Sequence, residues 1–160
     1  MHDEYRIRPA TPQDAAVIAR HRGEMFRSMG EFDDAAAREV AAASLPQLDE
    51  MMRRGEYRGW LVLCNGQTVA GGGMVLRKLL PRPRALQGGT ESLIVNVYTE
   101  PEHRHRGLAR QLMQTMLDWC RQHGVANVVL HASDEGRPLY QSLGFVPTNE
   151  MRLQANGRDQ

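Results

Sequence analysis

The sequence predicts a mixed α/β fold, and three observations support this expectation. Apolar positions switch along the chain between the alternation typical of strands and the three- or four-residue spacing typical of helices. The pair Asn65-Gly66 separates two β-rich runs and favours the tight turn of a hairpin. The 160 residues carry no internal repeat, low-complexity tract or linker, so we expect a single domain spanning residues 1–160.

The first half of the chain is expected to form a strand, two helices and a hairpin. Thr11 offers an N-cap and Pro12 stands at the first helical position, which is a typical helix start. Asp33 or Asp34 can cap a second helix, which Pro46 is expected to kink or split. The expected ranges are a strand at 5–8, helices at 11–30 and 33–52, and paired strands at 60–64 and 67–70.

The second half is expected to alternate strands and helices. The glycines at 71–73 indicate a bulge or a close approach by another backbone or ligand, the alternative being a flexible strand edge. The basic, proline-broken run 77–84 is expected to be a solvated loop. The expected elements are a strand at 91–99, a helix at 108–123, a strand at 125–130, a helix capped by Ser133 or Asp134 and ending at Gly144, and a last strand from 145 toward 153.

Composition excludes several classes of protein. Twenty basic and nineteen acidic side chains leave a net charge of +1, so no global field favours nucleic acid or an anionic membrane. No run approaches the roughly twenty apolar residues of a membrane span. Residues 1–4 are polar and lack the pattern of a signal peptide. We therefore expect a cytoplasmic protein that binds neither nucleic acid nor a membrane.

The cysteines and histidines form no metal-binding pattern along the sequence. Cys64 and Cys120 lie in apolar patterns without CxxC spacing, which favours buried thiols over a disulfide or a zinc site. His103 and His105 stand two residues apart in a basic turn, without the carboxylate or cysteine partners of a known site. We expect no metal.

The stretch from Arg104 to Ala109 is the strongest candidate site. It lies between a β-rich run and an amphipathic helix, and the first N–H groups of a helix have no internal partner and lie at the positive end of its dipole. Gly107 removes a side chain where an anion must approach, while Arg104, Arg106 and Arg110 add positive charge. The stretch predicts an anion site, the alternative being an ordinary helix start with solvated arginines.

Two motifs resemble signatures of a known family. Residues 97–109 resemble the acyl-CoA signature of the GNAT superfamily of N-acetyltransferases, with Arg104, Gly107 and Ala109 in its Arg/Gln-x-x-Gly-x-Gly/Ala pattern. Residues 136–145, at the expected distance downstream, resemble the second hallmark of that family. The resemblance implies a central, mixed and largely antiparallel sheet that is flanked by helices and splayed at the acyl-CoA site.

The resemblance also implies acetyl-CoA as the co-substrate. Backbone N–H groups from His105 to Arg110 would bind the CoA pyrophosphate, and the strand edge at 97–99 would pair with the pantetheine arm. Ser133 stands where many members have an asparagine, and its hydroxyl can either cap the next helix or bond to the pantetheine. The residues implied in binding are Val97, Tyr98, Thr99, Arg104, His105, Arg106, Gly107, Leu108, Ala109, Arg110, Ser133 and Gly136.

The resemblance implies that a primary amine attacks the thioester directly, in a ternary complex. In this family the equivalent tyrosine lies near the CoA sulfur, so Tyr140 is expected to protonate the leaving thiolate, the alternative being an ordinary packed aromatic. Glu91 is the first candidate for the base that takes the ammonium proton, with Glu24, His131 or a water as alternatives. A backbone N–H near Val97 would stabilise the oxyanion.

The sequence leaves the acceptor amine open. The amine belongs to a small molecule or to a protein, and the helices before Gly55 are where we expect it to bind. Acyl groups other than acetyl and a homodimer remain open as well. Two other functions fit the same motifs: a non-catalytic acyl-CoA-binding module, and an enzyme that holds a nucleotide phosphate in the same turn.

Overall fold

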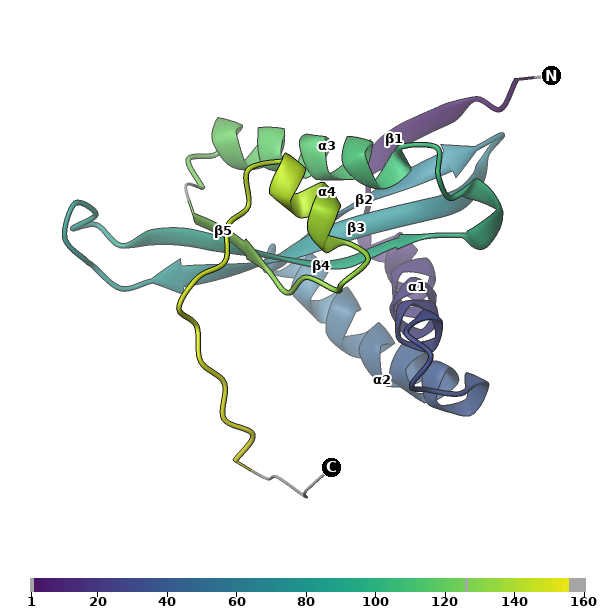
Figure 1. Ribbon diagram of the computed structural model, residues 1–160, viewed down its shortest axis with the longest axis horizontal. Coiled ribbons are helices and arrows are strands. Elements are labelled where there is room, and N and C mark those ends of the chain that lie inside the picture. The colour runs from purple at the N-terminus through teal and green to yellow at the C-terminus, as the bar shows by residue number, and fades with distance from the viewer. Residues whose placement is uncertain (1, 126, 156–160) are drawn as a thin grey trace.

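A computed structural model describes residues 2–125 and 127–155, and its centre is a five-stranded sheet in the order β1-β2-β3-β4-β5 (Figure 1). The strands are β1 Tyr5–Pro9, β2 Tyr57–Cys64, β3 Gln67–Leu79, β4 Gly89–Thr99 and β5 Asn127–Leu130. Neighbouring strands are antiparallel except for β4 and β5, which are parallel. The expectation of a mixed, largely antiparallel sheet is therefore confirmed.

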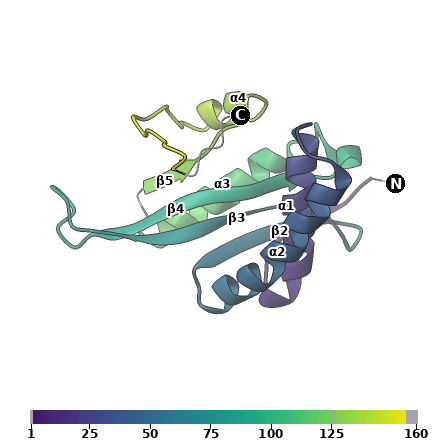
Figure 2. The ribbon, with the colours of Figure 1, turned by 90° about the horizontal axis from the view of Figure 1, so that it is seen from below.

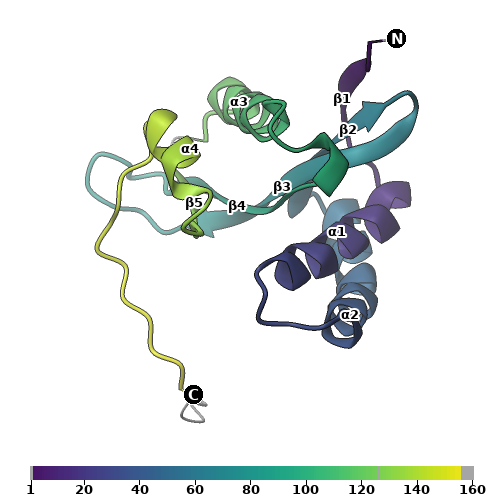
Figure 3. The same ribbon diagram turned by 45° about the vertical axis from the view of Figure 1, so that its right-hand side comes forward.

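Helices cover both faces of the sheet, with α1 and α2 on one side and α3 and α4 on the other (Figure 3). The helices are α1 Ala15–Ser28, α2 Asp34–Arg53, α3 Leu108–Gln122 and α4 Arg137–Ser142, with short 3-10 turns η1 Pro12–Asp14 and η2 Pro101–His103. Among the described residues, no helix combines the length and the apolar character needed to cross a membrane.

Each face of the sheet has its own hydrophobic core. Met113 and Met116 of α3 are fully buried against one face, and Ile18 of α1 is buried against the other. Successive side chains of a strand point to opposite faces, so Leu61 and Val62 of β2 belong to different cores. The two faces are thus packed independently, which matters because the site described below has a part on each.

The β2–β3 hairpin and its glycines follow the sequence closely. Asn65 and Gly66 both have positive φ angles, 50° and 83°, as a tight hairpin turn requires. The pairing of β3 with β4 shifts register between Gly71 and Gly73, so a bulge lies beside these glycines, with its extra residue in β4 rather than in the glycine strand. A Cβ atom on Gly73 would lie 2.1 Å from the Tyr57 hydroxyl, so this glycine admits a close approach by a buried phenol.

Helix α2 is continuous. The Asp33 side chain accepts a hydrogen bond from the Ala36 N–H at 2.9 Å and caps the helix, as expected. The alternative of a helix split at Pro46 is wrong, because α2 runs through it to Arg53. Proline removes one N–H donor, and the burial of Leu48 against α1 and β2 offsets that loss.

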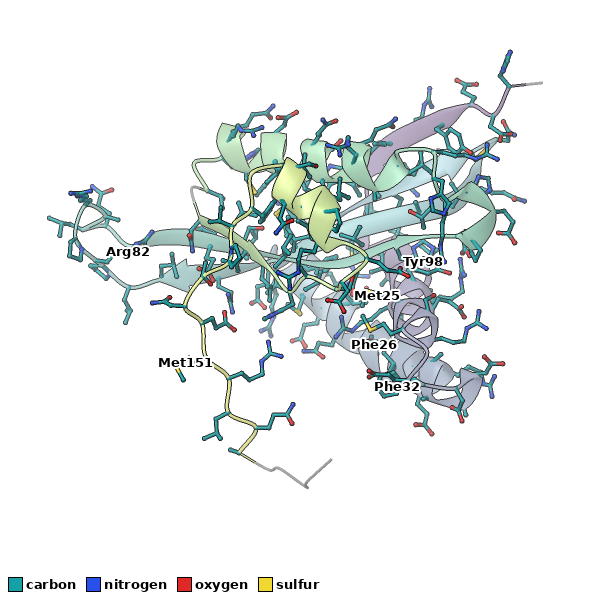
Figure 4. All side chains as sticks on the ribbon, viewed as in Figure 1. Met25, Phe26, Phe32, Arg82, Tyr98 and Met151 are labelled. Carbon is teal, nitrogen blue, oxygen red and sulfur yellow. The ribbon has the colours of Figure 1, made fainter. Side chains whose placement is uncertain are left out.

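The β3–β4 hairpin is longer than the sequence predicts. Residues 77–79, expected in a solvated loop, continue β3 and pair with residues 89–91 of β4. The expectation of a loop is wrong there because the opposite strand supplies backbone partners for these basic residues. Figure 2 shows the hairpin extending beyond the helices, and Arg82 lies at its turn (Figure 4).

The chain after α4 leaves the sheet. The last strand expected from 145 toward 153 is wrong: within the described residues 145–155 the chain forms no strand and runs away from β5 (Figure 1). Val146, Met151 and Leu153 are 75%, 95% and 89% exposed. Strand propensity has little effect without a surface to pack on, and these side chains contact no core.

Candidate active site

Strands β4 and β5 separate partway along their length. β5 pairs with β4 only over residues 91–94, so the next residues of β4 have no partner on that side among the described strands. Asn96 has a φ of 60°, and two residues of β4, Asn96 and Val97, stand opposite one residue of β3. The splay leaves residues 97–99 with an open edge, which is the geometry that accepts an extended, strand-like ligand.

The turn after β4 presents backbone donors. His105 and Gly107 both have positive φ, 62° and 77°, and α3 begins at Leu108. Gln111 is the first residue whose N–H bonds back, to the Gly107 carbonyl at 3.1 Å. The N–H groups of residues 108–110 therefore have no partner within the helix. They lie at the positive end of the helix dipole, where an anion binds best.

The arginines of this turn are anchored to three different parts of the chain. Each guanidinium contacts a separate part of the fold, which holds the turn in place and still leaves donors exposed. The contact to α4 joins the start of α3 to the helix that carries Tyr140. The contacts are Arg104 with the Thr99 carbonyl (2.9 Å), Arg106 with Asp3 (2.5 Å) and Arg110 with the Ser142 hydroxyl (2.9 Å).

Tyr140 lies half-buried on α4, with its ring edge-on to Phe145 at 6.0 Å between centroids. Burial raises the pKa of the Tyr140 phenol above its ordinary value of 10.0, so the group carries its proton at neutral pH. A Cβ on Gly136 would lie 2.7 Å from the tyrosine ring, so glycine there allows the close contact. The Ser133 hydroxyl accepts the Gly136 N–H at 3.1 Å and caps the turn before α4.

Glu91 lies at the far end of β4 from the splay. Its carboxylate contacts Arg77 of β3 and the side-chain amide of Asn127 of β5. At a rise of about 3.3 Å per residue, it lies roughly 20 Å along the strand from Val97. The structure therefore does not bring this carboxylate to the open edge. His131, another candidate base, is exposed just after β5.

Glu24 lies where α1 crosses β4. The ring of His21 is 5.1 Å from the ring of Tyr98, and Glu24 follows within one turn of α1. Burial and then the charges of Glu100 and Glu24 raise the pKa of Tyr98. The Glu24 carboxylate pairs with Arg27 at 2.6 Å. Of the candidate carboxylates, this one lies on the α1 face beside the splayed part of β4.

A buried polar network on the same face escaped the sequence analysis. The Asn96 amide donates to the Tyr57 hydroxyl at 3.1 Å, and its carbonyl oxygen accepts from Arg22 Nη1 at 2.9 Å. Asn96 and Tyr57 are 5% and 3% exposed, and burial raises the pKa of Tyr57 to about 12. One signal was available: an asparagine inside an apolar strand is a buried polar group that needs a partner.

His21 is the second buried polar group on this face. It is 1% exposed, its Nε2 has no hydrogen-bond partner among the described residues, and it lies 3.6 Å from Glu100 Oε1. Burial and the charge of Arg20 lower the pKa of His21 from 6.5 to about 4, outweighing the opposing effect of Glu100. His21 is therefore neutral in the folded protein near pH 7.

The fold gives His103 neighbours that sequence spacing could not show. Ligand atoms of Asp3, Cys64 and His103 all lie within 4.8 Å of one another. Asp3 is paired with Arg106, and His103 Nδ1 lies 2.9 Å from the Tyr5 hydroxyl. These contacts already give Asp3 and His103 partners and place a guanidinium beside the carboxylate, which opposes a cation there.

Comparison with known proteins shows similarity to one family of enzymes. Residues 19–145 match the Acetyltransferase (GNAT) family. A solved GCN5-related N-acetyltransferase from Ralstonia eutropha JMP134 is 32% identical, with a TM-score of 0.83 over 96% of this chain and 100% of that one. A predicted acetyltransferase from Clostridium acetobutylicum, solved with acetyl-CoA, is 22% identical, with a TM-score of 0.81 over 96% of each chain.

Similarity to curated enzymes is local. The chain is 31% identical over 77 residues to glucosamine 6-phosphate N-acetyltransferase of Trypanosoma brucei brucei, which is 47% of this chain and 52% of that enzyme. The matched segments span 26% to 52% of the curated relatives' own lengths. Local similarity of this kind does not transfer an acceptor from those proteins to this one.

Proposed function

This chain belongs to the acetyltransferase (GNAT) family, and on that premise we propose that it transfers the acetyl group of acetyl-CoA to a primary amine by direct attack in a ternary complex. The observation that carries the proposal is the open edge of β4 at residues 97–99. Beside this edge lie the first turn of α3 and the helix α4, which are in contact with each other. Arg110 and Ser142 join those elements, and Val97 and Tyr140 pack against the same core.

The residues around the opening fit acetyl-CoA. The edge at 97–99 offers backbone groups to the amides of the pantetheine arm, and the N–H groups of 108–110 offer donors to the pyrophosphate. The absence of a side chain at Gly107 keeps that approach open. The acetyl thioester, when bound, supplies the electrophilic carbonyl, and the protein supplies position and proton transfer.

The transfer needs two proton movements. The acceptor arrives as an ammonium ion and must lose a proton before its nitrogen attacks the thioester carbonyl. A backbone N–H near Val97 stabilises the oxyanion, the carbon–sulfur bond breaks, and the Tyr140 hydroxyl gives its proton to the departing thiolate. The half-buried Tyr140, protonated at neutral pH, supports its assignment as the acid.

We propose that Glu24, rather than Glu91, is the base that takes the proton from the acceptor ammonium. Glu24 lies on α1, and the residues just before it in this helix, His21 and Arg22, contact Tyr98 and Asn96 of β4. Glu91 is held by Arg77 at the far end of the strand. A carboxylate on the α1 face can take the proton directly or through one water, with the acceptor between α1 and β4.

The decisive experiment is an acceptor panel. Purified protein is incubated with acetyl-CoA and small amines, amino acids, aminoglycosides, polyamines and peptides, and free thiol release is followed against a no-acceptor control. Amine-dependent thiol release with a matching acetylated product supports the proposal. Tight acetyl-CoA binding without turnover on any amine would favour the non-catalytic binding module, and ATP competing as well as CoA would favour a nucleotide site.

A further inference from the structure

The α1 face contains an arginine in a fixed position. Arg22 is half-buried, and its guanidinium donates to the buried Asn96, which in turn donates to the buried Tyr57. The same guanidinium lies over the Phe26 ring, 5.1 Å from its centre. These contacts orient the arginine, so less side-chain freedom is lost when it binds a ligand.

Arg22 has no acidic partner on this face. Its neighbours on α1 are paired, Arg20 with Glu100 at 2.8 Å and Arg27 with Glu24 at 2.6 Å. Among residues 2–125 and 127–155, no carboxylate oxygen lies within 4.0 Å of the Arg22 guanidinium. A partly buried cation without a counter-charge is unfavourable, and an anionic ligand group relieves that cost.

The position of Arg22 matches the acceptor side of the proposed reaction. Its partner Asn96 directly precedes Val97, whose backbone N–H is proposed to face the reacting carbonyl. An anion bound to Arg22 therefore lies close to the attacking nitrogen. An α-amino acid has this geometry, because its amine and its carboxylate are attached to the same carbon.

Apolar side chains lie next to Arg22 on one side. Met25 and Phe26 follow on α1, and Phe32 packs edge-on against Phe26 at 5.9 Å between ring centres. Figure 4 shows these three side chains close to one another, on the side of the sheet where α1 lies. Phe32 is 46% exposed, so part of this surface is free to contact a ligand.

We propose that the acceptor is an α-amino acid with an apolar side chain, whose carboxylate binds Arg22 and whose side chain packs on Met25, Phe26 and Phe32. The inference rests on the proposed function and narrows its substrate class. A single guanidinium balances one negative charge, which favours a carboxylate over a phosphate dianion. Asn96 and Tyr57 act as positioning residues for the guanidinium.

The test compares matched acceptors. We expect kcat/KM to fall at least tenfold from L-phenylalanine to L-phenylalaninamide and 2-phenylethylamine, which lack the carboxylate. Glucosamine 6-phosphate and glucosamine test whether the site prefers a phosphate to a carboxylate. A higher kcat/KM for the phosphorylated sugar than for phenylalanine would overturn the amino acid assignment. Equal rates on phenylalanine and its amide would overturn the Arg22 site while leaving acetyl transfer intact.

Variants locate the effect. Arg22→Gln is expected to raise the KM for phenylalanine about thirtyfold and to abolish the preference for the acid over the amide, while KM for acetyl-CoA stays unchanged. Arg38→Ala, an exposed arginine change on α2, is the matched control and should retain the preference. Retention of the preference in Arg22→Gln would overturn the proposal. The wild-type comparison does not depend on the variant folding.

A binding measurement separates this inference from the proposed activity. Calorimetry with CoA present should show that N-acetyl-L-phenylalanine binds to the wild type. The amide of this compound should bind the wild type at least tenfold more weakly, and the acid should bind Arg22→Gln at least tenfold more weakly than it binds the wild type. This result supports the Arg22 site even if no amine is acetylated, in which case only the proposed activity fails. Equal binding of acid and amide would overturn the site.

Discussion

The donor and acceptor sites proposed on the two sides of the splayed sheet differ in the groups that would bind the ligand. On the α3 face, the proposed donor site consists of backbone groups: the open edge at 97–99 and the N–H groups of 108–110. On the α1 face, the proposed acceptor site consists of side chains: Arg22 and the apolar Met25, Phe26 and Phe32, with the Arg22 guanidinium held by Asn96, which in turn bonds to Tyr57. The donor half is contiguous in sequence, whereas the acceptor half is assembled by folding.

The two faces also differ in the exposure and charge of their polar groups. The arginines of the donor turn are exposed and each contacts a different element, so the turn is held from several sides. Polar groups are buried on the α1 face. Burial lowers the pKa of His21 and raises the pKa of Tyr57, and both shifts favour the neutral form of the side chain. One face is thus suited to a highly charged ligand that stays partly in water, and the other to a smaller group that is largely desolvated.

Gly107→Glu should have the largest effect and tests the donor face. We expect the Kd for acetyl-CoA to rise about a thousandfold, because charge-assisted bonds to phosphate are lost and a carboxylate faces the anion. The measurement is calorimetric titration of the folded variant. Gly124→Glu is the matched control: both glycines have positive φ, 77° and 70°, and open space around an added Cβ. Comparable Kd values for the two variants would contradict the donor site.

Tyr140→Phe should have the next largest effect. We expect kcat to fall about a hundredfold while the Kd for acetyl-CoA stays unchanged, because only the proton for the leaving thiolate is removed. Burial raises the pKa of Tyr140, so loss of its proton should not reduce the wild-type rate between pH 7 and about 9. Steady-state kinetics across that range provides the check, and an unaltered kcat would exclude tyrosine as the acid.

Glu24→Gln tests whether the acceptor face supplies the base. We expect kcat near pH 7 to fall several tens of fold and to recover partly toward pH 10, where more of the amine is already deprotonated. Arg27→Ala breaks the same ion pair but keeps the carboxylate, so its kcat should stay within a few-fold of the wild type.

Glu91→Gln completes that comparison. Its carboxylate lies at the distant end of β4, so we expect kcat to change less than about twofold and the pH profile to be retained. Rate profiles of the two glutamine variants are measured side by side. A larger loss in Glu91→Gln than in Glu24→Gln would return the role of base to Glu91.

The last prediction concerns stability and the buried His21. Burial lowers its pKa from 6.5 to about 4, so between these values the unfolded chain binds more protons than the folded protein. The stability contribution is complete above pH 6.5 and is lost as the pH falls toward 4. We expect a loss of about 2 kcal/mol at pH 5 relative to pH 8.

Urea unfolding at the two pH values measures this loss, with His21→Gln as the comparison. The variant lacks the titrating group, so its unfolding free energy should depend less steeply on pH. An identical pH dependence in both proteins would mean that the buried imidazole does not carry the effect.

The sequence by itself determined the donor half of the protein. The strand run, the basic turn with Gly107 and the α3 helix are neighbours in the chain, so local propensities predict their structure and a short motif indicates the task proposed for them. The hairpin at Asn65-Gly66 and the cap at Asp33 were predictable for the same reason, because a turn or a cap is made within a few residues.

Only the tertiary structure decided the acceptor half. Arg22 and Asn96 are 74 residues apart in sequence, and Asn96 and Tyr57 are 39 apart, so no local pattern could pair them. The same limit applies to Glu91, whose distance from the open edge depends on where β5 stops pairing. It also applies to the chain after Phe145, where a strand pattern found no surface to pack on. Contacts between distant segments depend on the packing of the whole chain, and here that packing brought together the groups proposed to select the acceptor.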